Sequence, residues 1–213
     1  MNILVMAAVA LERDAVLRGL HASKDFNVAI AGVGAAAAAA QTATLLAAAT
    51  YDLVISAGIA GGFVGRAEVG SIVIADAAIA ADLGAQTPDG FRSLDQLGFG
   101  SSQVPVDVGL AKRLAEALRA AGGPVYTGTI LTVSTVTGTA ETAAELVARV
   151  PGATAEAMEG YGVGMAAYQS GIPFLEIRAI SNAVGPRDRS AWRIEEALHA
   201  LEAASKTLRE VLQ

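Results

Sequence analysis

The chain has no cysteine, so disulfide bridges, thiolate zinc sites and cysteine nucleophiles are excluded. Its two histidines, His21 and His199, argue against a histidine-rich metal site and against a serine triad. Aromatic residues make up only 5% of the chain, so the core must be built from alanine, valine, leucine and isoleucine. With 53% hydrophobic and 17% charged residues, the composition is that of a folded protein and not of a disordered one.

Positive charge is also scarce, because 15 basic residues face 21 acidic ones and leave a net charge of −6. Proteins that bind nucleic acid present basic faces, so we expect no nucleic-acid partner. Residues 26–51 carry no charge and are long enough to span a bilayer. Alanine dominates this run, and glycine, glutamine and threonine interrupt it, which favours a buried strand followed by a helix. We expect no membrane segment and, without a signal-peptide pattern, a cytoplasmic enzyme.

Apolar runs of strand length alternate with helical patterns along all 213 residues. This alternation predicts a single α/β domain over residues 1–213, with a central, mostly parallel, twisted (mixed) sheet flanked by helices. We expect strands at 2–7, 27–31, 52–57, 71–78, 125–134, 153–157 and 173–180. We expect helices at 12–20, 35–49, 107–121, 139–150, 159–169 and 190–212, with 82–103 lacking a clear period.

Strand ends are where such folds bind ligands, so the loops after residues 7, 57, 134, 157 and 180 should converge. The third strand should end in a glycine turn at 58–62. Thr139 is a predicted N-cap. In the last helix, one apolar stripe should hold Ile194, Leu198, Leu201, Leu208 and Leu212.

A glycine pair, Gly32 and Gly34, loosely matches the dinucleotide-binding fingerprint. The acid that should bind the ribose is missing from the far end of the next strand, and the chain has no phosphate-binding G-x-x-x-x-G-K-[ST] motif. We therefore expect neither a cofactor nor a metal.

Four strand-end segments carry the functional signal: AAVALE at 7–12, GIAGG at 58–62, EAMEG at 156–160 and RAISN at 178–182. Three further runs are ADLGA at 81–85, TVSTVTGT at 132–139 and SNAVGPRDR at 181–189. In this order they resemble the purine nucleoside phosphorylase and methylthioadenosine/S-adenosylhomocysteine nucleosidase superfamily. Within it the chain is most similar to the futalosine hydrolase family, over residues 1–212.

The resemblance implies a nucleoside phosphorylase-like fold and a purine nucleoside as substrate. It further implies hydrolysis of the N-glycosidic bond of futalosine to hypoxanthine and dehypoxanthine futalosine, a step of menaquinone biosynthesis. Relatives complete the 5′ side of the site from a neighbouring subunit, which implies a homo-oligomer, either a dimer or a tetramer. We expect residues 82–103 to make that contact.

Cleavage of an N-glycosidic bond develops positive charge on the sugar and negative charge on the departing base. The enzyme therefore needs a carboxylate to activate water, a donor for the base and groups that hold the ribose. Glu12 matches the water-activating glutamate of the nucleosidases. The alternative for Glu12 is a solvated acid in the first turn of a helix, where the dipole favours it.

Met158 and Glu159 match the ribose-binding pair of the family. A glutamate can accept hydrogen bonds from two vicinal hydroxyls, and a polarisable methionine can pack on the sugar. The alternative is a core methionine beside an acid that starts a helix. Glu156 is assigned no role. In the family pattern one residue stands between the two glutamates, whereas here two residues stand between Glu156 and Glu159.

Asn182 stands where adenine-cleaving relatives have aspartate. An amide can donate a hydrogen bond to O6 or N7, so Asn182 suits a 6-oxopurine; an Asx-type turn before Pro186 is the alternative. By resemblance Thr135, Val136 and Thr137 lie along the base. Ile59 is a further candidate, in the segment whose glycines let the backbone approach a ligand.

Arg187 is our candidate for the benzoate on the 5′ extension of futalosine, since a buried anion needs a cation or directed donors. The alternative is an ion pair, with Asp188 or with an acid elsewhere, that only pins the loop. Segment 58–62 lacks an anion-binding hydroxyl and a basic partner, which favours hydrolysis over phosphorolysis.

Two other functions stay open: a methylthioadenosine or adenosylhomocysteine nucleosidase, and a purine-nucleoside-binding protein without activity.

Overall fold

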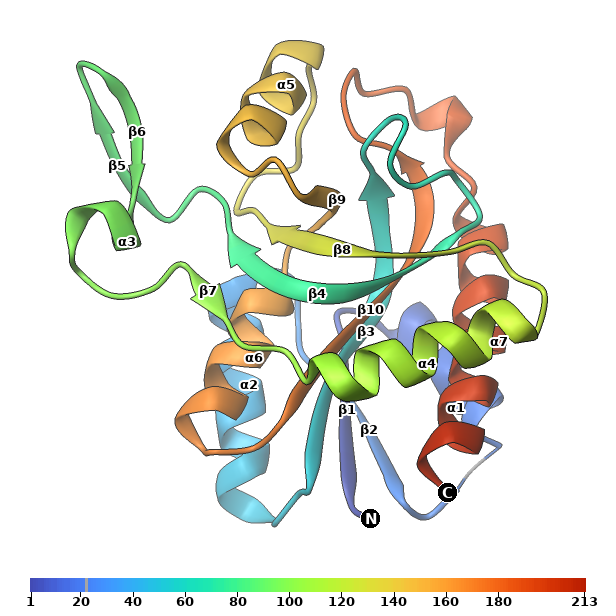
Figure 1. Ribbon diagram of the computed structural model, residues 1–213. Helices are drawn as coiled ribbons and strands as arrows, with labels where there is room; N and C mark the ends of the chain where they lie inside the picture. Colours follow the sequence, from blue (N-terminus) through green and yellow to red (C-terminus); the bar gives the residue numbers. More distant parts are fainter. Residues whose placement is uncertain (22) are drawn as a thin grey trace.

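The computed structural model describes residues 1–21 and 23–213. In the described part of the chain, eight strands form one mixed sheet in the order β10-β4-β8-β9-β3-β1-β2, with β7 paired to β4 (Figure 1). The strands of the main path are β1 (Ile3–Ala7), β2 (Phe26–Ile30), β3 (Leu53–Gly62), β4 (Ile72–Ala80), β8 (Val125–Thr132), β9 (Ala153–Ala157) and β10 (Phe174–Ala183). Most pairings are parallel, as the sequence predicts; β10 with β4, β3 with β9 and β4 with β7 (Gln103–Val104) are antiparallel.

One part of this sheet closes on itself. Strand β3 pairs with both β9 and β10, so β10, β4, β8, β9 and β3 complete a ring of five strands. Apolar side chains from all five strands pack together here, among them Ala60, Ala75, Ile130, Ala155 and Ile180. The closed ring brings the ends of β3, β9 and β10 together.

Helices cover the sheet on two sides (Figure 1). One core cluster joins the sheet to α1 (Ala10–Leu20), α4 (Val108–Ala120) and α7 (Ile194–Leu212). A second joins it to α2 (Ala35–Ala48) and α6 (Gly160–Gln169). Helix α5 (Ala140–Arg149) begins at Thr139, whose side chain accepts a hydrogen bond from the backbone N–H of Thr142, so the predicted N-cap is confirmed.

Three expectations about element bounds are wrong. Strand β3 runs on through Gly62, so residues 58–62 form no turn, because β10 and β9 continue to pair with them. Strand β10 likewise extends to Ala183. Helix α7 begins at Ile194, after the 3-10 turn Arg189–Ala191, and Ile194 is exposed and lies outside the buried stripe.

The stretch without a clear period projects from the sheet as a separate small unit. It holds the hairpin of β5 (Gly84–Thr87) and β6 (Gly90–Ser93), followed by α3 (Leu94–Leu97) (Figure 1). Asp95 accepts hydrogen bonds from the backbone of Ser102 and the hydroxyl of Ser101, which ties α3 to the approach of β7. Among the described helices, none has the length and apolar character needed to cross a bilayer.

Candidate active site

A cavity of about 230 Å³ opens where β1, β3, β8, β9 and β10 end. Residues from all five predicted loop regions line it, so the expected convergence is confirmed. The predicted site residues on its wall are Glu12, Ile59, Val136, Thr137, Met158, Glu159 and Asn182. The cavity is also lined by residues that were not predicted as site residues: Val33, Glu156, Val184 and Trp192.

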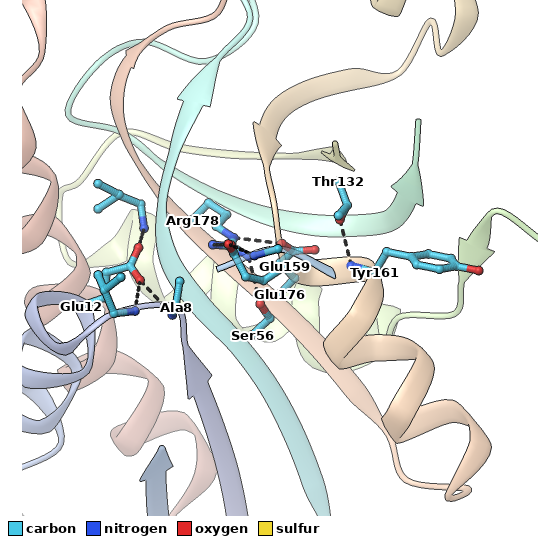
Figure 2. Close-up of polar contacts among 11 residues, drawn as sticks. Ala8, Glu12, Ser56, Thr132, Glu159, Tyr161, Glu176 and Arg178 are labelled. Carbon is cyan, nitrogen blue, oxygen red and sulfur yellow. Dashed lines mark hydrogen bonds and ion pairs between the residues drawn. The ribbon is translucent and has the colours of Figure 1, made fainter. Parts of the chain in front are cut away.

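Glu12 lies in the first turn of α1 but points back under the cavity (Figure 2). Its Oε2 accepts hydrogen bonds from the backbone N–H groups of Ala8 at 2.9 Å and Val9 at 3.2 Å. Its Oε1 accepts one from the N–H of Ile59 on β3 at 2.8 Å. The helix-start alternative is therefore partly correct, yet the side chain is only 4% exposed and is not solvated. Three backbone donors fix this carboxylate at the cavity wall.

Burial raises the pKa of Glu12 above its ordinary value, and the positive charge of Arg178 and the Ile59 N–H oppose that rise. A carboxylate with a raised pKa is a stronger base, which is what activation of water near neutral pH requires. A Cβ on Gly58 would lie 2.6 Å from Oε1 of Glu12 and 2.8 Å from Nη1 of Arg178. Gly58 thus makes room for these two side chains.

Glu159, the predicted ribose ligand, is held from two sides. The N–H of Gly34 donates to its Oε1 at 3.2 Å, and Nη1 of Arg178 lies 3.3 Å from its Oε2. Gly34 has a φ of +93°, a conformation that glycine adopts without strain. The glycine pair that resembles a dinucleotide fingerprint is therefore used here to anchor an acid of the cavity.

Arg178 is the centre of a buried polar cluster on β10 and its neighbours (Figure 2). Its Nε donates to Oε1 of Glu176 at 2.9 Å, and its Nη2 donates to Oγ of Ser56 at 3.0 Å. Glu176 is fully buried, and burial raises its pKa against the opposing charge of Arg178. The cluster fixes the guanidinium between Glu159 and the cavity-facing Glu12.

Asn182 and Glu156 also line the cavity. Oδ1 of Asn182 accepts from the hydroxyl of Ser181 at 2.8 Å, and its Nδ2 donates to the carbonyl of Ala183 at 3.0 Å, which leaves one N–H hydrogen free. Glu156 accepts from both the backbone N–H of Thr137, at 2.8 Å, and the Thr137 hydroxyl. The cavity wall thus offers an amide donor and a carboxylate acceptor.

The family model of the phosphorylase superfamily matches residues 12–213. A futalosine hydrolase of Streptomyces coelicolor is 52% identical, over 100% of this chain and 97% of its own length. A futalosine hydrolase of Acidothermus cellulolyticus is 48% identical, over 96% of this chain and 89% of its own length. The chain belongs to the futalosine hydrolase family of the phosphorylase superfamily.

The solved structure of a Helicobacter pylori futalosine hydrolase superposes with a TM-score of 0.86, over 99% of this chain and 97% of that one. At 17% identity this likeness concerns the fold. The nucleoside phosphorylase-like α/β domain expected from the sequence is therefore confirmed.

For this member of the futalosine hydrolase family, two predicted site residues lie outside the cavity. Thr135 is exposed and faces a neighbouring hollow beside α5. Arg187 lines a smaller hollow of about 150 Å³. Four residues line both this hollow and the cavity: Val136, Thr137, Asn182 and Trp192. Val136 and Thr137 line both the hollow beside α5 and the cavity, whereas Thr135 lines the hollow beside α5 alone.

Arg187 does not form the ion pair with Asp188 that the sequence left as its alternative. Its guanidinium lies 5.1 Å from the ring centroid of Trp192, within the range of a cation–π contact. Asp188 instead accepts a hydrogen bond from the backbone N–H of Ser190 at 3.0 Å. Trp192 also lines the cavity, so Arg187 contacts a residue of the cavity wall from outside.

In the described part of the chain, no arginine or lysine lines the cavity. Arg13 pairs with Asp14 at 2.7 Å, and Arg66 donates to the backbone carbonyls of residues 151 and 153. Both arginines near the predicted site in sequence are therefore engaged elsewhere. Glu12, Glu156 and Glu159 make the cavity wall acidic, which disfavours a phosphate anion.

A larger hollow of about 800 Å³ lies between the β5–β6 hairpin and α5. Its wall includes Asp82, Phe91 and Arg149, and the Arg149 guanidinium stacks 3.8 Å from the ring of Phe91. The hollow contains neither Glu12 nor Glu159, so its size does not make it the reaction site.

Glu176 and Arg178, which hold a predicted site residue in place, were not found from the sequence, and Glu156 was considered and given no role. Arg178 stands in a segment that carried the resemblance, and a charged residue within a buried strand is itself a signal, because such a charge needs partners. The same signal applies to Glu176, two residues earlier. Trp192 gave a weaker signal, as the chain's single tryptophan in the loop before α7.

Proposed function

We propose that this protein hydrolyses the N-glycosidic bond of futalosine, releasing hypoxanthine and leaving dehypoxanthine futalosine. The observation that carries the proposal is a full-length identity of 52% to a futalosine hydrolase, together with a cavity that holds Glu12, Glu159 and Asn182. The reaction belongs to menaquinone biosynthesis.

In the proposed mechanism Glu12 is the general base. Its carboxylate takes a proton from water as the water oxygen bonds to C1′, and the bond from C1′ to the base nitrogen breaks with its electron pair leaving on the purine. The base takes up a proton from solvent and departs, and Glu12 returns to solvent the proton that it took from water. The three backbone N–H groups that hold Glu12 keep its oxygens in place, so no reorganisation is needed during the reaction.

The sugar is assigned to Glu159 and Met158. Glu159 accepts hydrogen bonds from the two ribose hydroxyls, and Arg178 and Gly34 hold its carboxylate in position. Asn182 donates to O6 or N7 of hypoxanthine, which stabilises the negative charge on the leaving base. Ile59, Val136 and Thr137 pack along the nucleoside.

Water rather than phosphate is the proposed acceptor. Phosphorolysis requires a cation or several directed donors for the anion. The cavity wall instead carries three glutamates, and Arg13 and Arg66 are engaged elsewhere. The acidic wall therefore favours hydrolysis.

The test is base release from the purified protein in phosphate-free buffer, with futalosine, inosine and methylthioadenosine as substrates and chromatography as the readout. We expect hypoxanthine from futalosine at a rate that added phosphate does not increase. Adenine from methylthioadenosine with intact futalosine would instead support the nucleosidase alternative. Saturable binding without release of any base would support the binding-protein alternative. A homo-oligomeric assembly, as a dimer or tetramer, and a cytoplasmic location stay predictions.

A further inference from the structure

Glu156 is a buried carboxylate on the cavity wall that the reaction described above does not use. It lies on β9, is 5% exposed, and burial raises its pKa, opposed by the two Thr137 hydrogen bonds. Burying an acid is costly unless donors compensate it. In the described part of the chain it forms no ion pair with a cation, and its carboxylate reaches the cavity in which the substrate binds.

The strand register places Glu156 opposite Asn182. Gly61 on β3 pairs with Asn182 on β10 on one side and with Glu156 on β9 on the other. Directly paired residues of neighbouring strands place their side chains on the same face of a sheet. Asn182 and Glu156 therefore flank Gly61 on one face, and all three line the cavity.

Gly61 keeps the space between these two side chains open. A Cβ at this position would lie 3.3 Å from Nδ2 of Asn182 and 2.8 Å from Cγ2 of Val184. Two strand spacings separate Asn182 from Glu156, which is about 10 Å between their backbones. Nδ2 of Asn182 lies over Gly61, between the two backbones, so a base bound above Gly61 can reach both side chains.

The chemistry of the two side chains selects between purines. A 6-oxopurine presents acceptors at O6 and N7 and a donor at N1–H, whereas a 6-aminopurine presents a donor at its amino group and an acceptor at N1. Asn182 has a free N–H to donate, and each oxygen of Glu156 keeps a lone pair beyond the one that Thr137 occupies. An ionised Glu156 would repel the unprotonated N1 of adenine.

We propose that Glu156 accepts a hydrogen bond from N1–H of the hypoxanthine base, so that Glu156 and Asn182 together select a 6-oxopurine. The inference rests on the proposed function, since it assigns the base-reading residues of that same cavity. Glu156 is then a specificity-determining residue that contacts substrate, in addition to holding Thr137.

The test compares two substrates that differ only in the base: futalosine and its 6-amino counterpart, which has the same 5′ extension. We expect Glu156→Gln to lower kcat/KM for futalosine tenfold to a hundredfold, the range for a hydrogen bond to a charged group. For the 6-amino substrate, kcat/KM should fall less than threefold or should rise, because a glutamine amide can donate to N1 of adenine. Equal losses on both substrates, or no loss on futalosine, would overturn the proposal.

A matched variant separates base recognition from loop positioning. Thr137→Val removes the hydroxyl that donates to Glu156 but leaves the carboxylate in the wall. If Glu156 only held Thr137, both variants would lower kcat/KM equally for the two substrates. The ratio of the two kcat/KM values would then be unchanged. We expect that ratio to change in Glu156→Gln and to stay within threefold of wild type in Thr137→Val, with melting temperatures measured for each. If Glu156→Gln does not fold, Glu156→Asp, which withdraws the same charge by one methylene, must change the ratio in the same direction.

Binding of the free bases keeps this inference apart from the reaction itself. The dissociation constants of hypoxanthine and 1-methylhypoxanthine can be measured by calorimetry even if the protein does not cleave futalosine. We expect wild type to prefer hypoxanthine at least tenfold, and Glu156→Gln to reduce that preference. An unchanged preference would overturn the role of Glu156, whereas a changed preference in a protein that cleaves no futalosine would overturn only the proposed function.

Discussion

Nε of Arg178 donates a 2.9 Å hydrogen bond to Oε1 of Glu176, and both side chains are almost completely buried. Oε2 of Glu176 has no hydrogen-bond partner among the described residues. The same guanidinium also serves Glu159. The Arg178 guanidinium therefore holds two acids, Glu159 of the predicted site and Glu176 beneath it. Arg178 thus contributes to stability as well as to the position of Glu159.

We expect Arg178→Met to lower the free energy of unfolding by about 3–5 kcal/mol, the usual cost of leaving a buried acid unpaired. The matched control is Arg18→Met, because Arg18 and Glu202 form a pair of 2.7 Å on the surface. Exposed pairs contribute about 0–1 kcal/mol. Urea denaturation measures the free energy of unfolding of both variants. A decrease for Arg178→Met no larger than that for Arg18→Met would contradict the prediction.

Replacement of the predicted base tests the reaction directly. We expect Glu12→Gln to reduce kcat on futalosine by about two to four orders of magnitude while substrate still binds, the range for a positioned acid–base group. The measurement is steady-state kinetics, with calorimetry for binding and a melting curve for the fold. Near-normal turnover in a folded variant would remove Glu12 from the mechanism.

The pH profile of the wild-type enzyme should report the same group. Glu12 acts as a base only when deprotonated, and burial raises its pKa above the ordinary value of 4.5. We therefore expect kcat/KM to rise with pH through a midpoint above 4.5 and then level off. A profile with its acid limb at or below 4.5 would show that another group governs activity.

Asn182→Asp is expected to lower kcat/KM for futalosine about tenfold to a hundredfold, because a carboxylate cannot donate to O6 or N7 and leaves buried groups mispaired. The change also removes the Nδ2 donor that the carbonyl of Ala183 accepts from. Activity on the 6-amino counterpart provides the comparison. Unaffected turnover of futalosine would mean that Asn182 does not read the base.

Arg187 can be tested against a neighbour in the same loop. Arg187 and Arg189 both lie near the Trp192 ring, at 5.1 and 5.8 Å from its centroid. If Arg187 binds the benzoate, Arg187→Ala should reduce kcat/KM for futalosine at least tenfold more than for inosine or for futalosine methyl ester, and Arg189→Ala should not. Equal damage to all substrates, with a lower melting temperature, would assign Arg187 a purely structural role.

The packing of α6 against α2 depends on Gly162. A Cβ there would lie 2.1 Å from the backbone oxygen of Ala35, which cannot move without the helix. Alanine normally stabilises a helix by about 1 kcal/mol relative to glycine, but here the clash should outweigh that gain. We expect Gly162→Ala to lower the free energy of unfolding by about 1–3 kcal/mol. Gly123→Ala, where a Cβ meets nothing within 4 Å, is the control and should be close to neutral.

Much of the fold followed from the sequence because local patterns define single elements. The strand at 153–157 and the cap at Thr139 were predicted at the residues where the structure has them. The order of elements fixed a mostly parallel sheet, and the strand-end motifs indicated Glu12, Met158, Glu159 and Asn182. Periodicity and turn residues are local properties, so the amino-acid sequence determines them without knowledge of distant contacts.

Only the tertiary structure decided how these elements meet. Strand β3 continues through Gly62 because β9 and β10 pair with it there, and Glu156 and Asn182, which pair with Gly61, stand 95 and 121 residues further along the chain. The same closure sets Glu156 opposite Asn182 across Gly61 and places Arg178 among three glutamates. Glu156 was given no role because its spacing departs from the family pattern. Its position opposite Asn182 could not be foreseen, because register between distant strands is fixed by pairing and burial rather than by distance along the chain.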